Sequence, residues 1–216
     1  WCCDHLTVHC ESAAETVRER YGLGREASIT VIPHGHYVDA YPRNPSKSEA
    51  RRTLGLDADE AVFLFFGQIR PYKQVSKLIE AFERLDREGT KLVVAGNPRT
   101  DSLQRRIERA CGDREDVLTR LEFVPDDEVS RYFVASDAVV LPYRDILTSG
   151  SAILAMSFCR PAIVPRIGCI PDLVTDGVDG VLYDPEAPDG LEEAMDRALD
   201  RNLTEMGEAG YETVVR

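Results

Sequence analysis

Two short segments of the chain carry residue types that could hold an anionic ligand. In the first, Gly67 is followed by Arg70 and Lys73. Two fixed cations beside a glycine, which lets a ligand approach the backbone, are suited to a diphosphate. The second segment, Thr148–Ser151, has small side chains and immediately precedes an apolar helical pattern. The unpaired N–H groups and the dipole of a helix start favour an anion, so both segments indicate phosphate binding.

Each segment also has a simpler interpretation. Ser149 or Ser151 could instead simply cap the helix that follows, as serines at such positions often do. The two cations of the first segment could be solvated charges that pair with Glu80 or Asp86. The elements that position the two segments decide between these interpretations.

Short apolar runs alternate with amphipathic segments along most of the chain. The pattern predicts strands at residues 4–10, 28–32, 62–66, 91–95, 117–124, 138–141, 162–165 and 180–183. It predicts helices at residues 12–21, 46–54, 75–85, 103–111, 126–135, 152–158, 170–174 and 188–199. This alternation predicts βαβ crossovers and an α/β fold, a Rossmann-like parallel sheet with helices on both faces.

In such a sheet, ligands bind outside the carboxyl ends of the strands. That edge would bring together the loops that follow strands, including both segments above and the loops at residues 96–100 and 124–128. The segment at residues 34–45 is rich in turn formers and is interpreted as a linker. We expect its His34 and His36 to make structural hydrogen bonds, because no acidic or cysteine partner lies nearby in sequence.

Charge and motifs exclude several classes of function. The formal net charge of −12 disfavours nucleic acid as a partner, and the 22 Arg and 4 Lys are outnumbered by 38 Asp and Glu. In so acidic a chain, an anion site must build its own local positive charge. The absence of a GxGxxG or GxxxxGK[ST] motif disfavours NAD- and ATP-dependent activities.

The lengths of the apolar runs and the spacing of the cysteines indicate the compartment in which the protein is located. No run approaches the ~20 apolar residues of a membrane span, and the amino terminus lacks a signal-peptide pattern. A soluble, cytoplasmic protein is therefore predicted. The six cysteines (Cys2, Cys3, Cys10, Cys111, Cys159 and Cys169) show no metal-ligand spacing. They are interpreted as reduced packing thiols, in preference to disulfides or a metal site.

The order of motifs resembles the carboxyl-terminal, donor-binding half of a GT-B glycosyltransferase of the family 4 type (glycosyl transferase group 1). The matching text is VIPHGHYVDAYP, FLFFGQIRPYKQVSKLIEAF, KLVVAGNP, FVPDDEVSRYFVASDAVVLPY and AMSFCRPAIVPRIGCIPDLVTDGVDGVLYDP. The resemblance covers roughly residues 4–199. It implies a remnant of the amino-terminal acceptor domain at residues 1–33, the interdomain linker at 34–45 and the donor domain at 46–216.

The resemblance implies retaining transfer of a sugar from a nucleotide-diphosphate sugar to an unidentified acceptor, without an obligatory metal or other cofactor. Arg70 and Lys73 would then stabilise the leaving diphosphate, and Asp145 or Arg144 would lie nearest the sugar, with Asp145 as the possible sugar contact. The loop at Phe123–Asp126 would lie against the nucleobase. The donor-binding residues implied are Gly67, Asn97, Phe123, Val124, Pro125, Tyr143, Arg144, Thr148, Ser149, Gly150 and Ser151. A peripheral membrane contact is compatible with the rest of such a protein.

The chain departs from the family pattern in two ways. Family members usually carry two glutamates eight positions apart, and the resemblance places Ile146 and Leu154 there, with Asp145 as a substitute for the first. The chain also lacks most of an acceptor domain and the long carboxyl-terminal helix, so we expect a fragment with weak donor binding and poor turnover. A GT-B nucleotide-sugar epimerase and a non-catalytic nucleotide-sugar- or partner-binding module are the alternatives.

Overall fold

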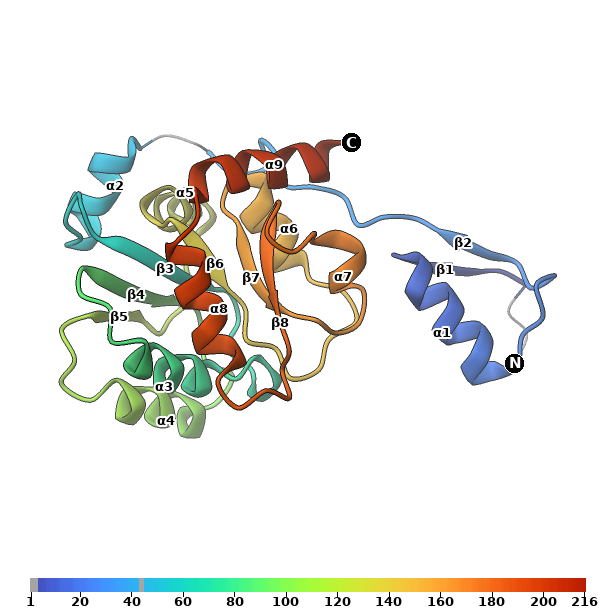
Figure 1. Cartoon of the computed structure of the whole chain (residues 1–216), viewed down its shortest axis with the longest axis horizontal. Coiled ribbons are helices and arrows are strands. Elements are labelled where there is room, and N and C mark those ends of the chain that lie inside the picture. The colour runs from blue at the N-terminus through green and yellow to red at the C-terminus, as the bar shows by residue number, and fades with distance from the viewer. Residues whose placement is uncertain (1–3, 43–44) are drawn as a thin grey trace.

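Six parallel strands form the main sheet of the computed structural model, which describes residues 4–42 and 45–216 (Figure 1). Their order across the sheet is β5-β4-β3-β6-β7-β8, and every neighbouring pair is parallel. The strands are β3 (Ala61–Phe66), β4 (Thr90–Ala95), β5 (Val117–Arg120), β6 (Ala138–Val140), β7 (Ala162–Pro165) and β8 (Gly180–Tyr183). This sheet confirms the predicted fold class.

Helices cover both faces of this sheet because successive side chains of a buried strand point to opposite sides. In β3, Val62 and Leu64 pack with one layer, whereas Phe63 and Phe65 pack with the other. The first layer contains α2 (Lys47–Leu54), α5 (Asp126–Ala135), α6 (Gly150–Ser157) and the short α7 (Ile170–Leu173). The second contains α3 (Val75–Leu85), α4 (Asp101–Cys111) and α8 (Gly190–Leu199). A 3₁₀ turn, η1 (Pro71–Lys73), directly precedes α3.

A final helix, α9 (Leu203–Val215), was not predicted. It packs against α6, and Gly210 lies beside Met156 of that helix. Two glycines and several β-branched residues give this segment a weak intrinsic helix propensity, so its local sequence pattern does not predict a helix. In the part of the chain that the structure describes, no helix combines the length and apolar character that a membrane span requires.

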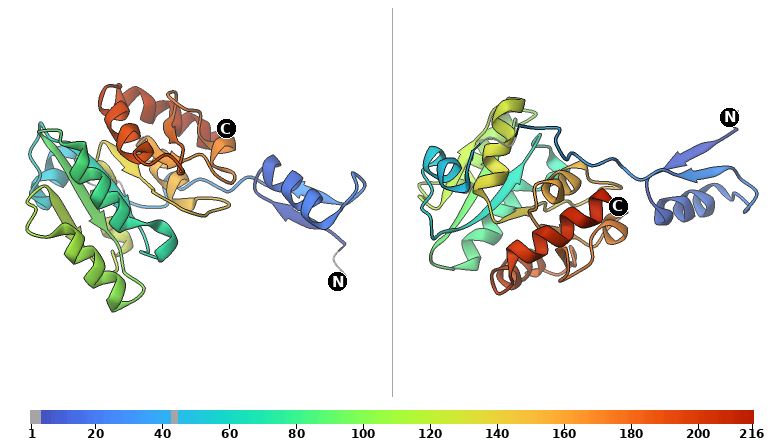
Figure 2. Two further views of the ribbon diagram at one scale, coloured as in Figure 1. Left: turned by 60° about the horizontal axis from the view of Figure 1, so that its bottom comes forward. Right: turned by 90° about the horizontal axis from the view of Figure 1, so that it is seen from above.

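The first described residues form a small unit that stands to one side of the main sheet (Figure 2). It consists of β1 (Leu6–Val8), α1 (Glu11–Tyr21) and β2 (Ile29–Val31), with β1 and β2 paired in parallel. From β2 a connector, residues 32–42, leads toward the main domain without a helix or strand. Strand β1 is shorter than the predicted 4–10, because Cys10 leaves the strand to cap α1 through its sulfur.

A disulfide between Cys10 and Cys169 joins this unit to the main domain, across 159 positions of sequence. The prediction of reduced packing thiols is therefore wrong for these two residues. Sequence spacing could not reveal the pair, since only the fold brings the start of α1 against the start of α7. Cys111 and Cys159 are free thiols, and Cys2 and Cys3 lie outside the described residues. The disulfide removes the cysteine argument for a reducing compartment.

Candidate functional site

The loops after β3 and β6 meet at the carboxyl edge of the sheet, where the strand order changes direction. The backbone N–H of Arg144 in the second loop donates to the Tyr72 carbonyl in the first, at 2.9 Å. Between them lies a hollow of about 330 Å³. Its lining is Tyr37, Tyr41, Phe66, Gly67, Tyr72, Lys73, Tyr143, Ile146, Thr148, Ser149, Gly150, Ser151 and Leu154. Such a crevice is the usual ligand site of an open α/β sheet.

Helix α6 begins at the floor of this hollow. Ser149 is its N-cap: its Oγ accepts from the Ala152 N–H at 3.1 Å and donates to the Tyr143 hydroxyl at 3.2 Å. The capping interpretation is thus correct for Ser149. The cap leaves the first helical N–H groups, those of Gly150 and Ser151, without a hydrogen bond among the described residues. These two amides remain available to an anion.

Lys73 supplies the positive charge of the hollow. Its residue is only 8% exposed, and its Nζ has no hydrogen bond or ion pair within residues 4–42 and 45–216. The ammonium lies instead near the Phe65 and Tyr143 rings, 5.8 and 5.7 Å from their centroids. Burial, and then the positive charge of Arg70, lower the pKa of Lys73 to about 8. An unpaired buried cation of this kind calls for an anionic partner.

Gly67 keeps the space between Lys73 and α6 open. Its φ of +120° is a conformation that residues with a Cβ rarely adopt. A Cβ at this position would lie 3.4 Å from the Lys73 Nζ and 3.7 Å from the Ser151 Oγ. The glycine therefore serves both the sharp exit from β3 and the close approach of a ligand to the backbone.

Aromatic side chains form much of the remaining wall. Tyr143 is buried, which raises the pKa of its hydroxyl, and its ring lies 6.1 Å from that of Tyr72. Tyr37 and Tyr41 reach the hollow from the connector. Sequence reasoning missed Tyr37, Tyr41 and Tyr72. The matching text YVDAY was visible in the linker, but no local signal placed it against α6.

Seven of the sequence-derived site residues line the hollow, and seven do not. The seven in the lining are Gly67, Lys73, Tyr143, Thr148, Ser149, Gly150 and Ser151. Arg70 is half-buried beside it, where its guanidinium donates to the Gln68 Oε1 at 2.7 Å. Its effect on the Lys73 pKa shows that the two cations are neighbours. Arg70 therefore lies beside Lys73 but outside the lining of the hollow.

The other six also lie outside the lining, four of them for reasons of topology. Asn97 follows β4 and the loop Phe123–Pro125 follows β5, so both lie on the β4–β5 side of β3, away from β6. Val124 is buried in the core, while Phe123 is 69% exposed. Arg144 and Asp145 are exposed on the loop after β6. The structure thus does not bring the proposed sugar-contacting carboxylate of Asp145 into the hollow.

Ile146 and Leu154 both line the hollow. These are the positions that the resemblance matches with two glutamates, so the alignment proposed from sequence falls on site residues. Leu154 is buried, and it joins the core cluster that Tyr143 also occupies. The site therefore presents apolar side chains where carboxylates would contact a sugar or a ribose.

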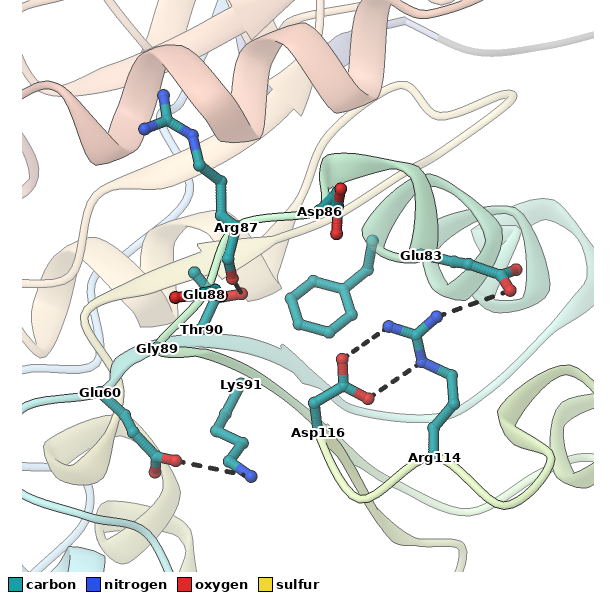
Figure 3. Close-up of a pocket in the computed structure, with 11 residues that line it drawn as sticks. Glu60, Glu83, Asp86, Arg87, Glu88, Gly89, Thr90, Lys91, Arg114 and Asp116 are labelled. Atoms are coloured by element: carbon teal, nitrogen blue, oxygen red, sulfur yellow. Dashed lines mark hydrogen bonds and ion pairs between the residues drawn. The ribbon is translucent and has the colours of Figure 1, made fainter.

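A second hollow, of about 390 Å³, lies at the amino ends of β3 and β4, where Glu60 and Thr90 line it (Figure 3). Its cations already have partners. Arg114 pairs with Asp116 at 2.6 Å and approaches Glu83 at 3.7 Å, and Lys91 lies 3.5 Å from Glu60. Five carboxylates against three cations make this lining acidic. It offers an anion neither free charge nor helix amides.

One group of described residues brings three potential metal-ligand atoms together: Cys10, Cys169 and Asp172. The two sulfurs are bonded to each other, and an Asp172 oxygen accepts from the Ser12 N–H and hydroxyl at 3.2 and 2.7 Å. These three potential ligand atoms are therefore engaged in structural contacts within the protein.

Comparison with known proteins assigns the chain that forms this hollow to a family. The family model of the glycosyl transferases group 1 matches residues 46–213. The chain belongs to this family. The matched range contains the whole main sheet and every lining residue of the hollow except Tyr37 and Tyr41.

Individual relatives agree with the assignment. Over 134 residues the chain is 33% identical to a GDP-mannose:glycolipid 4-beta-D-mannosyltransferase of Xanthomonas campestris, covering 62% of this chain and 36% of the relative. It is 31% identical over 214 residues to a D-inositol 3-phosphate glycosyltransferase of Segniliparus rotundus, covering 96% and 47%. The chain thus spans between a third and a half of these two relatives.

A solved structure shows the same fold. Anabaena HepE, crystallised in complex with UDP and glucose, superimposes with a TM-score of 0.80 at 22% identity, covering 98% of this chain and 58% of HepE. The covered part of this chain includes the small β1-α1-β2 unit as well as the main sheet.

Proposed function

We propose that the hollow binds the diphosphate of a nucleotide-sugar donor and that the chain is the donor-binding part of a glycosyltransferase. The observation that carries the proposal is the buried ammonium of Lys73 beside the amides of Gly150 and Ser151, all three without a hydrogen-bond partner among residues 4–42 and 45–216. Together they stabilise the negative charge that develops on a departing diphosphate, a role that a divalent cation takes in other enzymes. HepE was solved with UDP and glucose, and the Xanthomonas relative is named for GDP-mannose.

The domain assignment follows from this proposal. Residues 46–216 form the donor domain, and the β1-α1-β2 unit at its amino-terminal side is the piece of the acceptor domain. The linker at residues 34–45 includes residues 43–44, which lie outside the described part of the chain. The loop at Phe123–Asp126, which follows β5, would lie against the nucleobase and offer it main-chain contacts.

Nucleoside diphosphates are expected to stabilise the chain against heat. UDP, GDP and ADP would be added separately with and without Mg²⁺, followed by thermal denaturation and calorimetric titration. Because only the folded state offers the hollow, a ligand at 100 times its Kd adds about 2.7 kcal/mol to the free energy of unfolding. The midpoint should rise for at least one nucleotide, also without Mg²⁺. No rise with any of the three would overturn the proposal.

Replacing Arg70 by alanine should weaken diphosphate binding only a few-fold. Its guanidinium is partly solvated and already bonded to Gln68, so its contribution is about 1 kcal/mol. Removing its charge also lessens the repulsion that lowers the Lys73 pKa. Calorimetric titration of the variant checks this, and a loss as large as that caused by removing Lys73 would place Arg70 inside the site.

A non-catalytic nucleotide-sugar-binding module is the second candidate, favoured by the apolar Ile146 and Leu154. Incubation of the full-length protein with labelled donor and candidate acceptors separates it from a transferase and from an epimerase. For a transferase, we propose retention at the anomeric carbon, as the family resemblance implies. The Xanthomonas relative is named as a 4-beta-D-mannosyltransferase that uses GDP-mannose, so inversion is the outcome that would contradict retention. The anomeric configuration of the product, compared with that of the donor, therefore tests retention.

A further inference from the structure

His34 lies on the connector where it passes the amino end of α6. A Cβ built on Gly150 would lie 3.6 Å from the His34 Nε2 and 3.1 Å from the Tyr37 hydroxyl. The imidazole is half-buried, and its ring lies 5.9 Å from that of His9 and 5.8 Å from that of Tyr37. These contacts hold the side chain over the first residue of the helix.

The tautomer of the neutral His34 ring follows from the hydrogen bond at its Nδ1. Its Nδ1 lies 2.7 Å from the Gly35 carbonyl oxygen, and because a carbonyl only accepts, Nδ1 must carry the proton. In the neutral ring, Nε2 is then an acceptor. No hydrogen bond among the described residues occupies this Nε2. The His34 atom nearest to Gly150 is thus free to accept from a hydroxyl group.

His34 also lines a third hollow, of about 520 Å³, between the β1-α1-β2 unit and the main domain. This hollow and the diphosphate hollow share Thr148 and Ser149, so they adjoin at the start of α6. Lys73 belongs to the diphosphate hollow and His34 to the third. A donor whose diphosphate lies on the α6 amides can therefore extend its sugar toward the place where the two hollows meet.

We propose that His34 binds the transferred sugar of the donor, its Nε2 accepting a hydrogen bond from a sugar hydroxyl. The inference rests on the proposed donor site and adds a sugar-selecting residue to it. An acceptor nitrogen suits a hydroxyl, which can donate, and not an ionised phosphate, whose oxygens only accept. His34 should therefore affect the affinity for nucleotide sugars and leave that for nucleoside diphosphates unchanged.

The test compares two ligand pairs, GDP with GDP-mannose and UDP with UDP-glucose, by calorimetric titration of the full chain. In His34→Phe the ring stays but the acceptor is lost, and His34→Ala provides a second variant. Losing one hydrogen bond to a neutral group should weaken binding of the nucleotide sugar about fivefold to tenfold. Affinity for the diphosphate should stay within twofold.

His36→Phe is the matched control. It lies two residues further along the connector, is exposed, and its Nδ1 accepts from the Val38 N–H at 3.2 Å. It lines neither of the two hollows, so both affinities should be unchanged. Equal losses for sugar and diphosphate in His34→Phe, or no loss for either sugar, would overturn the role of His34. If the unaltered chain binds none of the four ligands, the proposed donor site itself fails.

Discussion

Replacing Lys73 by methionine should abolish most diphosphate binding and at the same time stabilise the ligand-free chain. Methionine retains the length and apolar stem of lysine and fills the same space beside Phe65 and Tyr143. It removes a charge-assisted contact that contributes about 1.5–3 kcal/mol, which corresponds to roughly tenfold to a hundredfold in affinity. It also removes a buried charge that, without ligand, has no ionic partner in the part of the chain that the structure describes.

The stability gain follows from the lowered pKa of Lys73. The pKa is about 8 in the folded chain and near 10.5 when the side chain is in water, so folding disfavours the charged form. The cost is present in full below pH 8, where both states are protonated, and amounts to about 3 kcal/mol. Between pH 8 and about 10.5 the unfolded chain holds more protons, so stability contributed by this group rises with pH.

Denaturant unfolding across pH 6–10.5 and nucleotide titration at pH 7 measure both effects. Lys73→Met should be more stable than the unaltered chain below pH 8 and approach it near pH 10.5. Lys77→Met is the control, since Lys77 lies on α3, half-buried, and lines no part of the hollow. A methionine variant that binds GDP or UDP as tightly as the unaltered chain would contradict the assigned role of Lys73.

Reduction of the Cys10–Cys169 disulfide should lower the free energy of unfolding by about 2–4 kcal/mol. The bond closes a loop across 159 positions, and in its absence the unfolded chain regains the entropy of that loop. Both sulfurs belong to a small buried cluster with Ala13, so the side chains stay packed in the native state. Denaturant unfolding with and without dithiothreitol measures the difference.

The double variant Cys10→Ser, Cys169→Ser should match the reduced chain and show no further response to dithiothreitol. Cys159→Ala, which removes a free thiol, should keep the full response. Under non-reducing conditions, mass spectrometry of proteolytic fragments should find the peptide containing Cys10 joined to that containing Cys169. Equal stability of the oxidised and reduced forms would show that the crosslink does not constrain the unfolded chain.

Local patterns predicted most of the main domain. Apolar runs such as Val62–Phe66 and Ala138–Val140 are buried on both faces, and a continuous β-branched or aromatic pattern reports this directly. Strand β5 ends at Arg120, short of the predicted 124. Val124 is buried in the loop between β5 and α5, and its burial does not come from strand pairing. Helix α9 escaped prediction because its packing on α6, and not its propensity, holds it.

Alternation of strands with helices required that the loops at Gly67–Lys73 and Thr148–Ser151 share one edge of the sheet, because helical crossovers join parallel strands and the carboxyl ends of parallel strands lie at the same edge. That much of the candidate site follows from residue order. Distances between segments remote in sequence do not follow from it, because they depend on side-chain packing. The tertiary structure alone decided that Lys73 is buried, without a hydrogen-bond or ionic partner among the described residues, while Arg70 is half-buried outside the lining of the hollow. It likewise brought Tyr37 and His34 onto Gly150, and Cys10 onto Cys169.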